Sequence, residues 1–252
     1  MIYRWLLVVL SIAATAAYAF APNARGWSTA PETARILFFH VPPAMLCSLF
    51  YLWAAIQGGV HLVKRSPESD HKSSAAVEIG TLLCALATVT GSMFAYIQWG
   101  RFWDWDPRQL DIFLQLMVYA AYFALRSSFT DPQRRAVIGA AYAIFAFVTV
   151  PFLIWIMPRL VALSKFSQHA QANNVVIGNQ LDATYRIYLY STAFVVLLVA
   201  CWAYELRTRQ LDLEQQTGDP IANRVSDSHP AVSNSGVVRP IRLRSDRSEA
   251  DS

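Results

Sequence analysis

The sequence predicts an all-α polytopic membrane protein with six transmembrane helices and an extracytoplasmic tryptophan-rich segment. Of its 252 residues, 55% are hydrophobic and only 15% are charged, whereas about 25% of the residues of a typical soluble domain are charged. The apolar residues gather in six long blocks, and 8 Trp, 14 Phe and 11 Tyr make the chain rich in aromatic side chains. The formal net charge of +4 is too small to indicate a nucleic-acid partner.

Each block has, or nearly has, the length needed to cross a bilayer. A helix needs about 17 to 25 apolar residues to span ~30 Å of hydrocarbon. The fourth block is the shortest, and we expect Arg126 to snorkel to the membrane surface and so to extend the helix to Phe129. In chain order, the blocks are residues 5–22, 36–63, 79–100, 112–125, 136–158 and 187–204.

The first block also has an alternative interpretation, as a cleavable signal peptide. Arg4 precedes its apolar stretch, and the triplet Ala19-Phe20-Ala21 ends it. Because Pro22 makes this triplet a poor cleavage position, we expect a retained helix.

The distribution of Lys and Arg predicts the orientation, because positive charge is retained on the cytoplasmic side. Alternate block ends, together with the C-terminal tail, carry fourteen of the 21 Lys and Arg residues, and the remaining ends carry seven. Both termini are therefore predicted to be cytoplasmic. Residues 1–204 then form a six-helix membrane domain, and residues 205–252, which are rich in Arg, Asp, Ser and Asn, form a disordered cytoplasmic tail.

Two classes of site are excluded by the sequence. Cys47, Cys84 and Cys201 lie singly in apolar runs, which excludes a CxxC redox pair, a CxxCH haem-attachment site and a cysteine-based zinc site. No glycine-rich nucleotide-binding loop is visible, so an ATPase activity would have to reside on another chain.

The densest chemistry of the chain lies in residues 98–111, on the outer side between the third and fourth blocks. If this segment is an interfacial helix up to Asp106, then Trp99 and Trp103 share one face and form a flat aromatic shelf for a planar, mostly apolar ligand. We expect Asp106 to end this helix before Pro107 and to accept an indole or backbone N–H. The alternative is an aromatic belt, because Trp favours the bilayer interface. The segment begins Gln98-Trp99-Gly100-Arg101-Phe102-Trp103-Asp104-Trp105-Asp106-Pro107-Arg108.

Two of the five histidines are predicted to face the same side as this shelf. His40 lies among apolar residues at the outer end of the second block, where an unpaired imidazole is costly, and His169 lies in the loop before the last block. Two neutral imidazoles on opposite sides of a planar macrocycle are what a six-coordinate haem iron requires. Each could instead be a structural histidine. We expect interfacial or solvated side chains for the other three, which are His61, His71 and His229.

The tryptophan-rich segment resembles the WWD signature of the haem-handling proteins of cytochrome c biogenesis. Its matching pattern is Trp99-Gly100-x-x-Trp103-x-Trp105-Asp106, followed by Pro107-Arg108. With six predicted helices, and with Phe39-His40-Val41-Pro42 opening the second, residues 1–204 are similar to CcmC, the haem exporter protein C family of the cytochrome c maturation system.

This resemblance implies a carrier of haem b in the inner membrane, and not an enzyme. His40 matches the first haem ligand of the family, and the second is expected in the loop that holds His169. The family presents haem to a periplasmic haem chaperone, together with a small single-helix membrane partner and ABC-type transporter subunits. The proline of Pro107-Arg108-Gln109 is closer to the haem lyases, which pass haem directly to apocytochrome c, so a haem lyase-type subunit is the alternative.

A parking site for haem follows as a hypothesis. His40 and His169 coordinate the iron, and Arg101 and Arg108 pair with the propionates, because a guanidinium binds a carboxylate bidentately. Contact with lipid phosphate is the alternative for both arginines. The ring is covered by the indoles of Trp99, Trp103 and Trp105.

Two haem-free functions remain as alternatives. In the first, the chain is a small-solute transporter, in which His40 and a break at Pro42-Pro43 line a cavity at the membrane midplane. In the second, it is a structural subunit that uses the shelf to dock other assembly factors.

Overall fold

The computed structural model describes residues 2–21, 31–157, 160 and 183–228, and these are almost entirely helical. No strand occurs in these ranges, which confirms the all-α prediction. The chain divides into a unit of residues Met1–Asp212 and a second unit of residues Leu213–Ser252. The elements are α1 (Ile2–Phe20), the 3-10 helix η1 (Pro31–Ile36), α2 (Leu37–Lys64), α3 (Pro67–Trp99), α4 (Pro107–Ser127), α5 (Pro132–Val150), the π-helical turn η2 (Pro151–Ile156) and α8 (Ala183–Ser228).

Helices that can cross a membrane account for most of the predicted blocks. Among the described residues, five spans are long and apolar enough to do so. The first block forms α1, in which the apolar stretch Trp5–Thr15 falls below that length. The five spans are Leu37–Lys64, Pro67–Trp99, Pro107–Ser127, Pro132–Ile156 and Ala183–Thr217.

Three of the helices begin at a proline, which suits the first position of a helix. Pro67, Pro107 and Pro132 are the first residues of α3, α4 and α5. The first N–H groups of a helix have no partner within the helix, so a proline costs nothing there, and its fixed φ suits the helix. The residue before α5, Asp131, also accepts a hydrogen bond from the Gln133 N–H at 3.0 Å.

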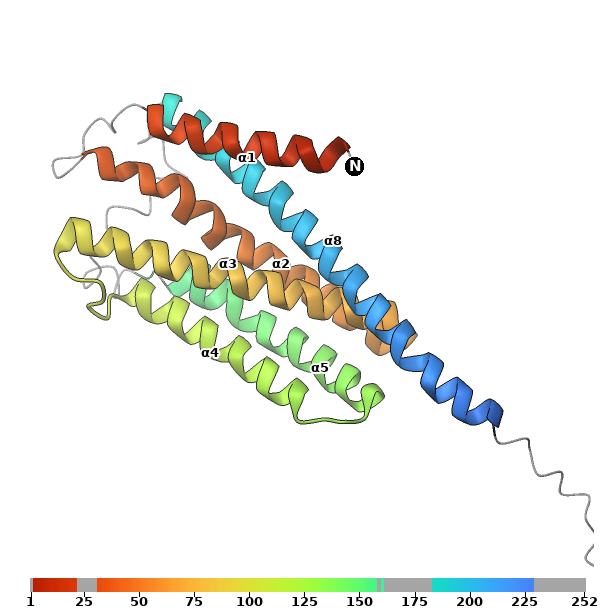
Figure 1. The fold of residues 1–252 in the computed structure, drawn as a ribbon. Coiled ribbons are helices and arrows are strands. Elements are labelled where there is room, and N and C mark those ends of the chain that lie inside the picture. Colours follow the sequence, from red (N-terminus) through yellow and green to blue (C-terminus); the bar gives the residue numbers. More distant parts are fainter. Residues whose placement is uncertain (1, 22–30, 158–159, 161–182, 229–252) are drawn as a thin grey trace, which may run out of the picture. The chain divides into compact units, whose positions relative to one another are not determined.

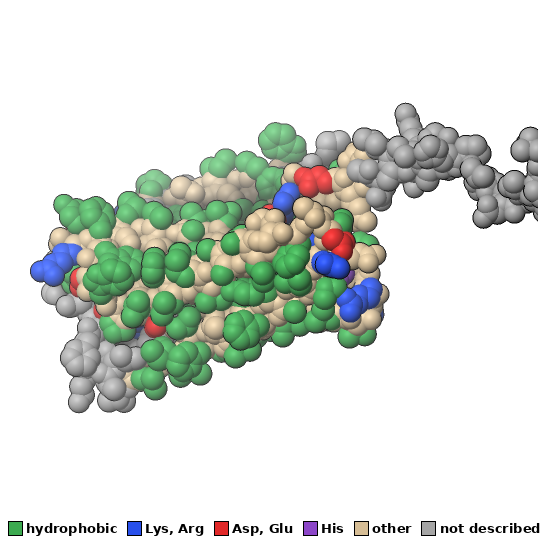
Figure 2. Space-filling model, turned by 90° about the horizontal axis from the view of Figure 1, so that it is seen from below, with side chains coloured by type: hydrophobic (Ala, Val, Ile, Leu, Met, Phe, Trp, Pro, Cys, Tyr) green, Lys and Arg blue, Asp and Glu red, His purple; other side chains and the backbone are tan. Residues whose placement is uncertain are grey.

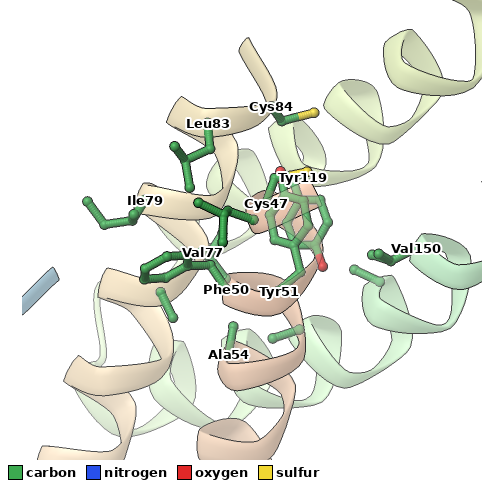
Figure 3. Close-up of a cluster of buried hydrophobic side chains, with 14 of the residues drawn as sticks. Cys47, Phe50, Tyr51, Ala54, Val77, Ile79, Leu83, Cys84, Tyr119 and Val150 are labelled. Carbon is green, nitrogen blue, oxygen red and sulfur yellow. The ribbon is translucent and has the colours of Figure 1, made fainter. Parts of the chain in front are cut away.

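The core of the first unit lies between α2, α3, α4, α5 and α8 (Figure 1). At its centre the rings of Tyr51 and Tyr119 stack with centroids 3.6 Å apart and an angle of 6° between planes (Figure 3). Small residues surround this pair and allow the backbones to approach closely, as is usual between membrane helices. They include Ala54, Ala76, Ala143 and Ala146, all fully buried.

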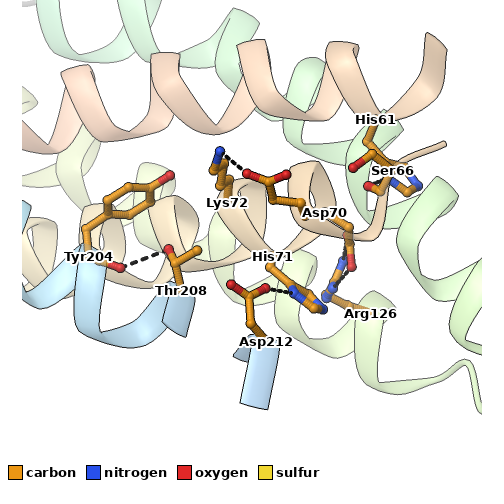
Figure 4. Close-up of polar contacts among 10 residues, drawn as sticks. His61, Ser66, Asp70, His71, Lys72, Arg126, Tyr204, Thr208 and Asp212 are labelled. Atoms are coloured by element: carbon orange, nitrogen blue, oxygen red, sulfur yellow. Dashed lines mark hydrogen bonds and ion pairs between the residues drawn. The ribbon is translucent and has the colours of Figure 1, made fainter. Parts of the chain in front are cut away.

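Polar side chains tie the helices together at the end of the bundle where α3 begins and α4 ends (Figure 4). Arg126 of α4 donates two hydrogen bonds to Asp70 of α3, at 2.7 and 2.6 Å. The snorkelling predicted for Arg126 is therefore wrong. The carboxylate lies inside the bundle, and it holds the guanidinium there, with the two side chains only 14% and 9% exposed.

Interfacial or solvated side chains were expected for the two histidines at this end, and the structure shows them with hydrogen-bond partners and little exposed surface. His61 is 5% exposed, and its Nδ1 lies 2.8 Å from the carbonyl of Ser66. His71 lies 2.6 Å from Asp212 of α8. A second contact between the same helices joins Arg207 to Glu78. Together these contacts attach α8 to the first half of α3.

The helix α8 also differs from the boundary that the composition predicts at residue 204. It continues without a break through residues 205–228, which were expected to be disordered. The ion pair between Arg207 and Glu78, and the pair of Glu205 with Arg209 one turn apart, give the polar part of the helix partners that composition does not reveal. Residues 229–252 lie outside the described residues.

The surface of the bundle has the character of a protein in lipid. Figure 2 shows apolar side chains over the visible flank, while charged side chains gather toward the ends. Large apolar residues such as Leu49 of α2, Leu82 of α3 and Phe145 of α5 are exposed. In water such a flank would be unfavourable, and in hydrocarbon it is expected.

Candidate functional site

The tryptophan-rich segment is a loop between two helices and not an interfacial helix. The helix α3 ends at Trp99, and Gly100 adopts the left-handed conformation, with φ of 75°, while its N–H donates to the Tyr96 carbonyl at 2.8 Å. Glycine favours this conformation because it has no Cβ. The prediction that Trp99 and Trp103 share a helix face is therefore wrong. We call residues 100–106 the tryptophan loop.

The loop ends at Asp106, which begins α4. As expected, its carboxylate accepts a backbone N–H, from Arg108 at 2.9 Å. This bond caps the start of α4, however, and does not end a preceding helix. The Asp106 side chain is buried, with 3% of the residue exposed. The residue therefore anchors the loop to the fourth membrane helix.

A second anchor is Gln109, in the first turn of α4. Its Oε1 accepts the Asp104 N–H at 3.0 Å, and its Nε2 donates to the Phe102 carbonyl at 3.3 Å. The two bonds lie on either side of Trp103 in the chain. Because Gln109 is buried, with 8% exposed, it fixes the backbone from which Trp103 projects.

Three aromatic rings pack edge to face around the loop, and we call them the aromatic triad: Trp103, Trp105 and Phe113. Their centroids lie 5.8, 6.3 and 6.4 Å apart, with planes inclined by 73° to 90°. Such T-shaped contacts are favourable between aromatic rings. The triad replaces the expected flat shelf by an angled aromatic surface.

Trp105 has two properties that are unusual for a large aromatic residue. It is 65% exposed, and its φ of 59° is in the left-handed region that few bulky residues adopt. Backbone strain of this kind costs about 1–3 kcal/mol and is typical of functional sites. The fold therefore keeps the Trp105 indole exposed to solvent, and the strained backbone of this residue makes that position costly.

The other two aromatic residues of the segment, Trp99 at the end of α3 and Phe102 of the loop, pack on earlier side chains of α3. Trp99 packs edge to face on Phe94, with centroids 5.7 Å apart. Phe102 stacks on Tyr96 at 4.2 Å. These contacts extend the aromatic surface from the loop along the last turns of α3.

His40 lies in the first turn of α2, on the same end of the bundle as the tryptophan loop. Its Nδ1 lies 3.0 Å from the Ala87 carbonyl and 3.2 Å from the Thr90 hydroxyl of α3. At 1.5 Å per residue, the eight residues from Gly91 to Trp99 place this level about 12 Å below the end of α3. A ligand that contacts both His40 and the loop must therefore be extended.

A haem iron needs fewer donors from the protein than a bare metal ion does. Within the described ranges no three His, Cys, Asp or Glu side chains gather to hold a metal. A porphyrin already supplies four nitrogens to its iron, so that only axial imidazoles are needed from the protein. Arg101 is exposed and Arg108 is half-buried beside the loop. His169 lies outside the described residues.

Two contributions escaped the sequence analysis. Gln109 holds the loop, and Phe113 completes the aromatic triad. Gln109 and Phe113 are four residues apart in α4 and so lie on the same side of the helix, but the sequence does not show what that side contacts. The buried residues of the helix are Gln109, Asp111, Gln115, Tyr119 and Tyr122.

Comparison with known proteins finds a matching family and relatives that carry the same name as that family. Residues 1–219 match the family described as Heme exporter protein C. The Heme exporter protein C of Paracoccus denitrificans is 26% identical over 71% of this chain and 76% of its own length, and that of Bradyrhizobium diazoefficiens is 28% identical over 73% and 72%. A mitochondrial ccmC-like protein of Marchantia polymorpha, whose name refers to cytochrome c biosynthesis, is 33% identical over 35% of this chain and 39% of its own.

Proposed function

This chain belongs to the haem exporter protein C family, and from that premise we propose that it binds haem b at the outer face of the inner membrane and presents it to an extracytoplasmic haem chaperone. The haem then serves cytochrome c maturation. Both termini are cytoplasmic in this proposal. A small single-helix membrane protein and ABC-type transporter subunits are its partners, as in the family resemblance.

The observation that carries the proposal is the tryptophan loop with its exposed indole. Trp105 is held open at a left-handed φ, Gln109 fixes the backbone on both sides of Trp103, and Asp106 anchors the end of the loop to α4. A merely structural aromatic belt has no need of a strained and doubly anchored loop, because belt residues are dispersed over helix ends. A preformed aromatic surface, in contrast, suits a planar ligand.

Each residue has a defined task in this proposal. His40 supplies an imidazole to the iron from α2, and His169 supplies the second from its loop. The triad contacts the porphyrin face, and Arg101 and Arg108 attract the propionates. No step requires a nucleophile or a proton transfer, and so the protein is a carrier and not an enzyme.

The alternatives differ in what they require of the structure. The transporter hypothesis needs a discontinuous helix at Pro42-Pro43, but α2 runs unbroken from Leu37 to Lys64 with both prolines inside it. A haem lyase-type subunit would use the same loop and transfer haem directly to apocytochrome c. The two functions share the binding site and differ in the protein that receives the haem, which is a haem chaperone in the proposed function and apocytochrome c in the alternative.

A transfer assay tests the proposal. Purified protein loaded with haemin is mixed with purified haem chaperone or with apocytochrome c, and the haem on each partner is measured after separation. We expect transfer to the chaperone alone. Trp103→Ala should reduce transfer more than it reduces haem binding, while Trp5→Ala, a change of an exposed tryptophan of α1, should leave both unchanged. Equal loss of binding and transfer in Trp103→Ala would refute the presenting role.

The orientation is tested separately. Arg101 is exposed in the loop, so Arg101→Cys, made in a chain whose three native cysteines are replaced by alanine, should react with a membrane-impermeant maleimide in intact spheroplasts. Reaction only after the membrane is opened would place the loop in the cytoplasm and would exclude delivery to an extracytoplasmic acceptor.

A further inference from the structure

The neighbours of His40 determine which of its nitrogens carries the proton. The Ala87 carbonyl, 3.0 Å from Nδ1, can only accept a hydrogen bond. The Thr90 hydroxyl, 3.2 Å from the same nitrogen, has two carbonyls of its own helix as acceptors for its single proton, Leu86 at 2.7 Å and Ala87 at 3.3 Å. It therefore can only accept from His40. Both contacts require a proton on Nδ1, so that the lone pair of the neutral imidazole is on Nε2.

The space for the ring comes from Gly91. A Cβ at this position would lie 2.7 Å from Cε1 of His40 and 3.2 Å from Nδ1. Real Cβ atoms do not approach heavy atoms so closely, because repulsion rises steeply at this distance. The ring can thus lie this close to α3 because residue 91 has no side chain.

Resting on the proposed haem site, we propose that Ala87, Thr90 and Gly91 of α3 form a cradle that presents Nε2 of His40 to the iron. Ala87 and Thr90 fix the tautomer, and Gly91 fixes the position of the ring. Partners of this kind raise the basicity of a histidine ligand, and their loss typically weakens metal binding about 10- to 100-fold. All three are positioning residues, because none needs to touch the haem.

Two variants with matched controls test the cradle. Gly91→Ala pushes the ring away, and Thr90→Val removes one acceptor at nearly constant volume. Gly59→Ala is the control for the first, because a Cβ there meets nothing within 4 Å in the described part of the chain. Thr88→Val is the control for the second, because the Thr88 hydroxyl donates to the Cys84 carbonyl of its own helix, at 2.9 Å, and does not contact His40. Thr90→Ser restores the acceptor and should restore the wild-type behaviour.

The expected results concern haem affinity and redox potential. In titrations with haemin, Gly91→Ala and Thr90→Val should bind about 10- to 100-fold more weakly than wild type, and the controls should bind equally well. A less basic imidazole stabilises ferric iron less, so Thr90→Val should also have a higher haem midpoint potential. A purely structural role of Thr90 would leave the potential unchanged, and that result would overturn the proposal for Thr90.

A measurement without haem keeps the cradle testable if Gly91→Ala does not fold. In the ligand-free protein labelled with ¹⁵N-histidine, the signals lost in His40→Gln should be those of an imidazole protonated at Nδ1. Protonation at Nε2 would overturn the proposed cradle. A different result would refute the proposed function, namely that His40→Ala binds haem as well as wild type does. If instead His40→Ala loses haem, while Gly91→Ala and Thr90→Val bind haem like wild type, only the proposed cradle is refuted.

Discussion

The loop anchor Gln109 gives a prediction whose magnitude follows from the structure. In Gln109→Met the volume of the side chain is nearly kept, but the hydrogen bonds to Asp104 and Phe102 are lost. Each contributes a net of about 0.5–1.5 kcal/mol, because folding exchanges them against bonds to water. Their sum of about 1–3 kcal/mol corresponds to an increase of about 5- to 150-fold in the population of the open loop.

Hydrogen–deuterium exchange of peptides that cover residues 101–106 measures this population in detergent. We expect faster exchange in Gln109→Met by the stated factor, with unchanged exchange in the middle of α3. The control is Gln133→Met, because Gln133 is exposed at the start of α5. The same exchange rate in wild type and Gln109→Met would show that Gln109 does not hold the loop, and would remove the explanation for the position of Trp103.

The remaining predictions concern the free energy of unfolding, measured by denaturant titration in detergent. Asp70→Ala leaves the largely enclosed Arg126 unpaired and should cost about 3–5 kcal/mol, whereas Glu68→Ala removes the more exposed pair of Glu68 with Lys72 and should cost less than about 1 kcal/mol; equal losses would contradict the enclosed ion pair. Gly100→Ala should cost about 1–2 kcal/mol through its positive φ alone, because a Cβ there meets no described atom within 4 Å, and no loss would refute the left-handed turn. Tyr119→Phe should cost nothing, since its buried hydroxyl has no hydrogen-bond partner among the described residues, and a loss above about 1 kcal/mol would reveal one.

The helices could be predicted because hydrophobic blocks of membrane length have few other solutions in lipid. The starts of α4 and α5 lie four to five residues before the predicted blocks at 112 and 136, although Asp106-Pro107 and Asp131-Pro132 each combine a side-chain cap with a proline at the first helical position. The WWD signature indicated the family, and residues 1–219 match it. Local chemistry that recurs in fixed patterns is thus visible in the sequence.

The details of the site depend on contacts between distant segments, which the sequence does not display. A helix through residues 100–106 was reasonable from spacing alone, but Gly100 ends α3 in a left-handed turn and Gln109 holds the loop from the next helix. Arg126 turns inward because it donates hydrogen bonds to Asp70. Asp70 lies 56 residues earlier in the chain, so the sequence around Arg126 does not reveal this partner. The helix α8 passes residue 204 because Arg207 reaches Glu78 of α3.

The visible spectrum of the purified protein tests the central claim most directly. The protein is isolated in detergent from cells with an abundant haem supply, and haem is quantified per chain beside the variants His40→Ala and His229→Ala. We predict a Soret band in wild type and His229→Ala, and a strongly reduced band in His40→Ala. A colourless wild-type protein, or an undiminished band in His40→Ala, would contradict a haem site built on His40 and the tryptophan loop.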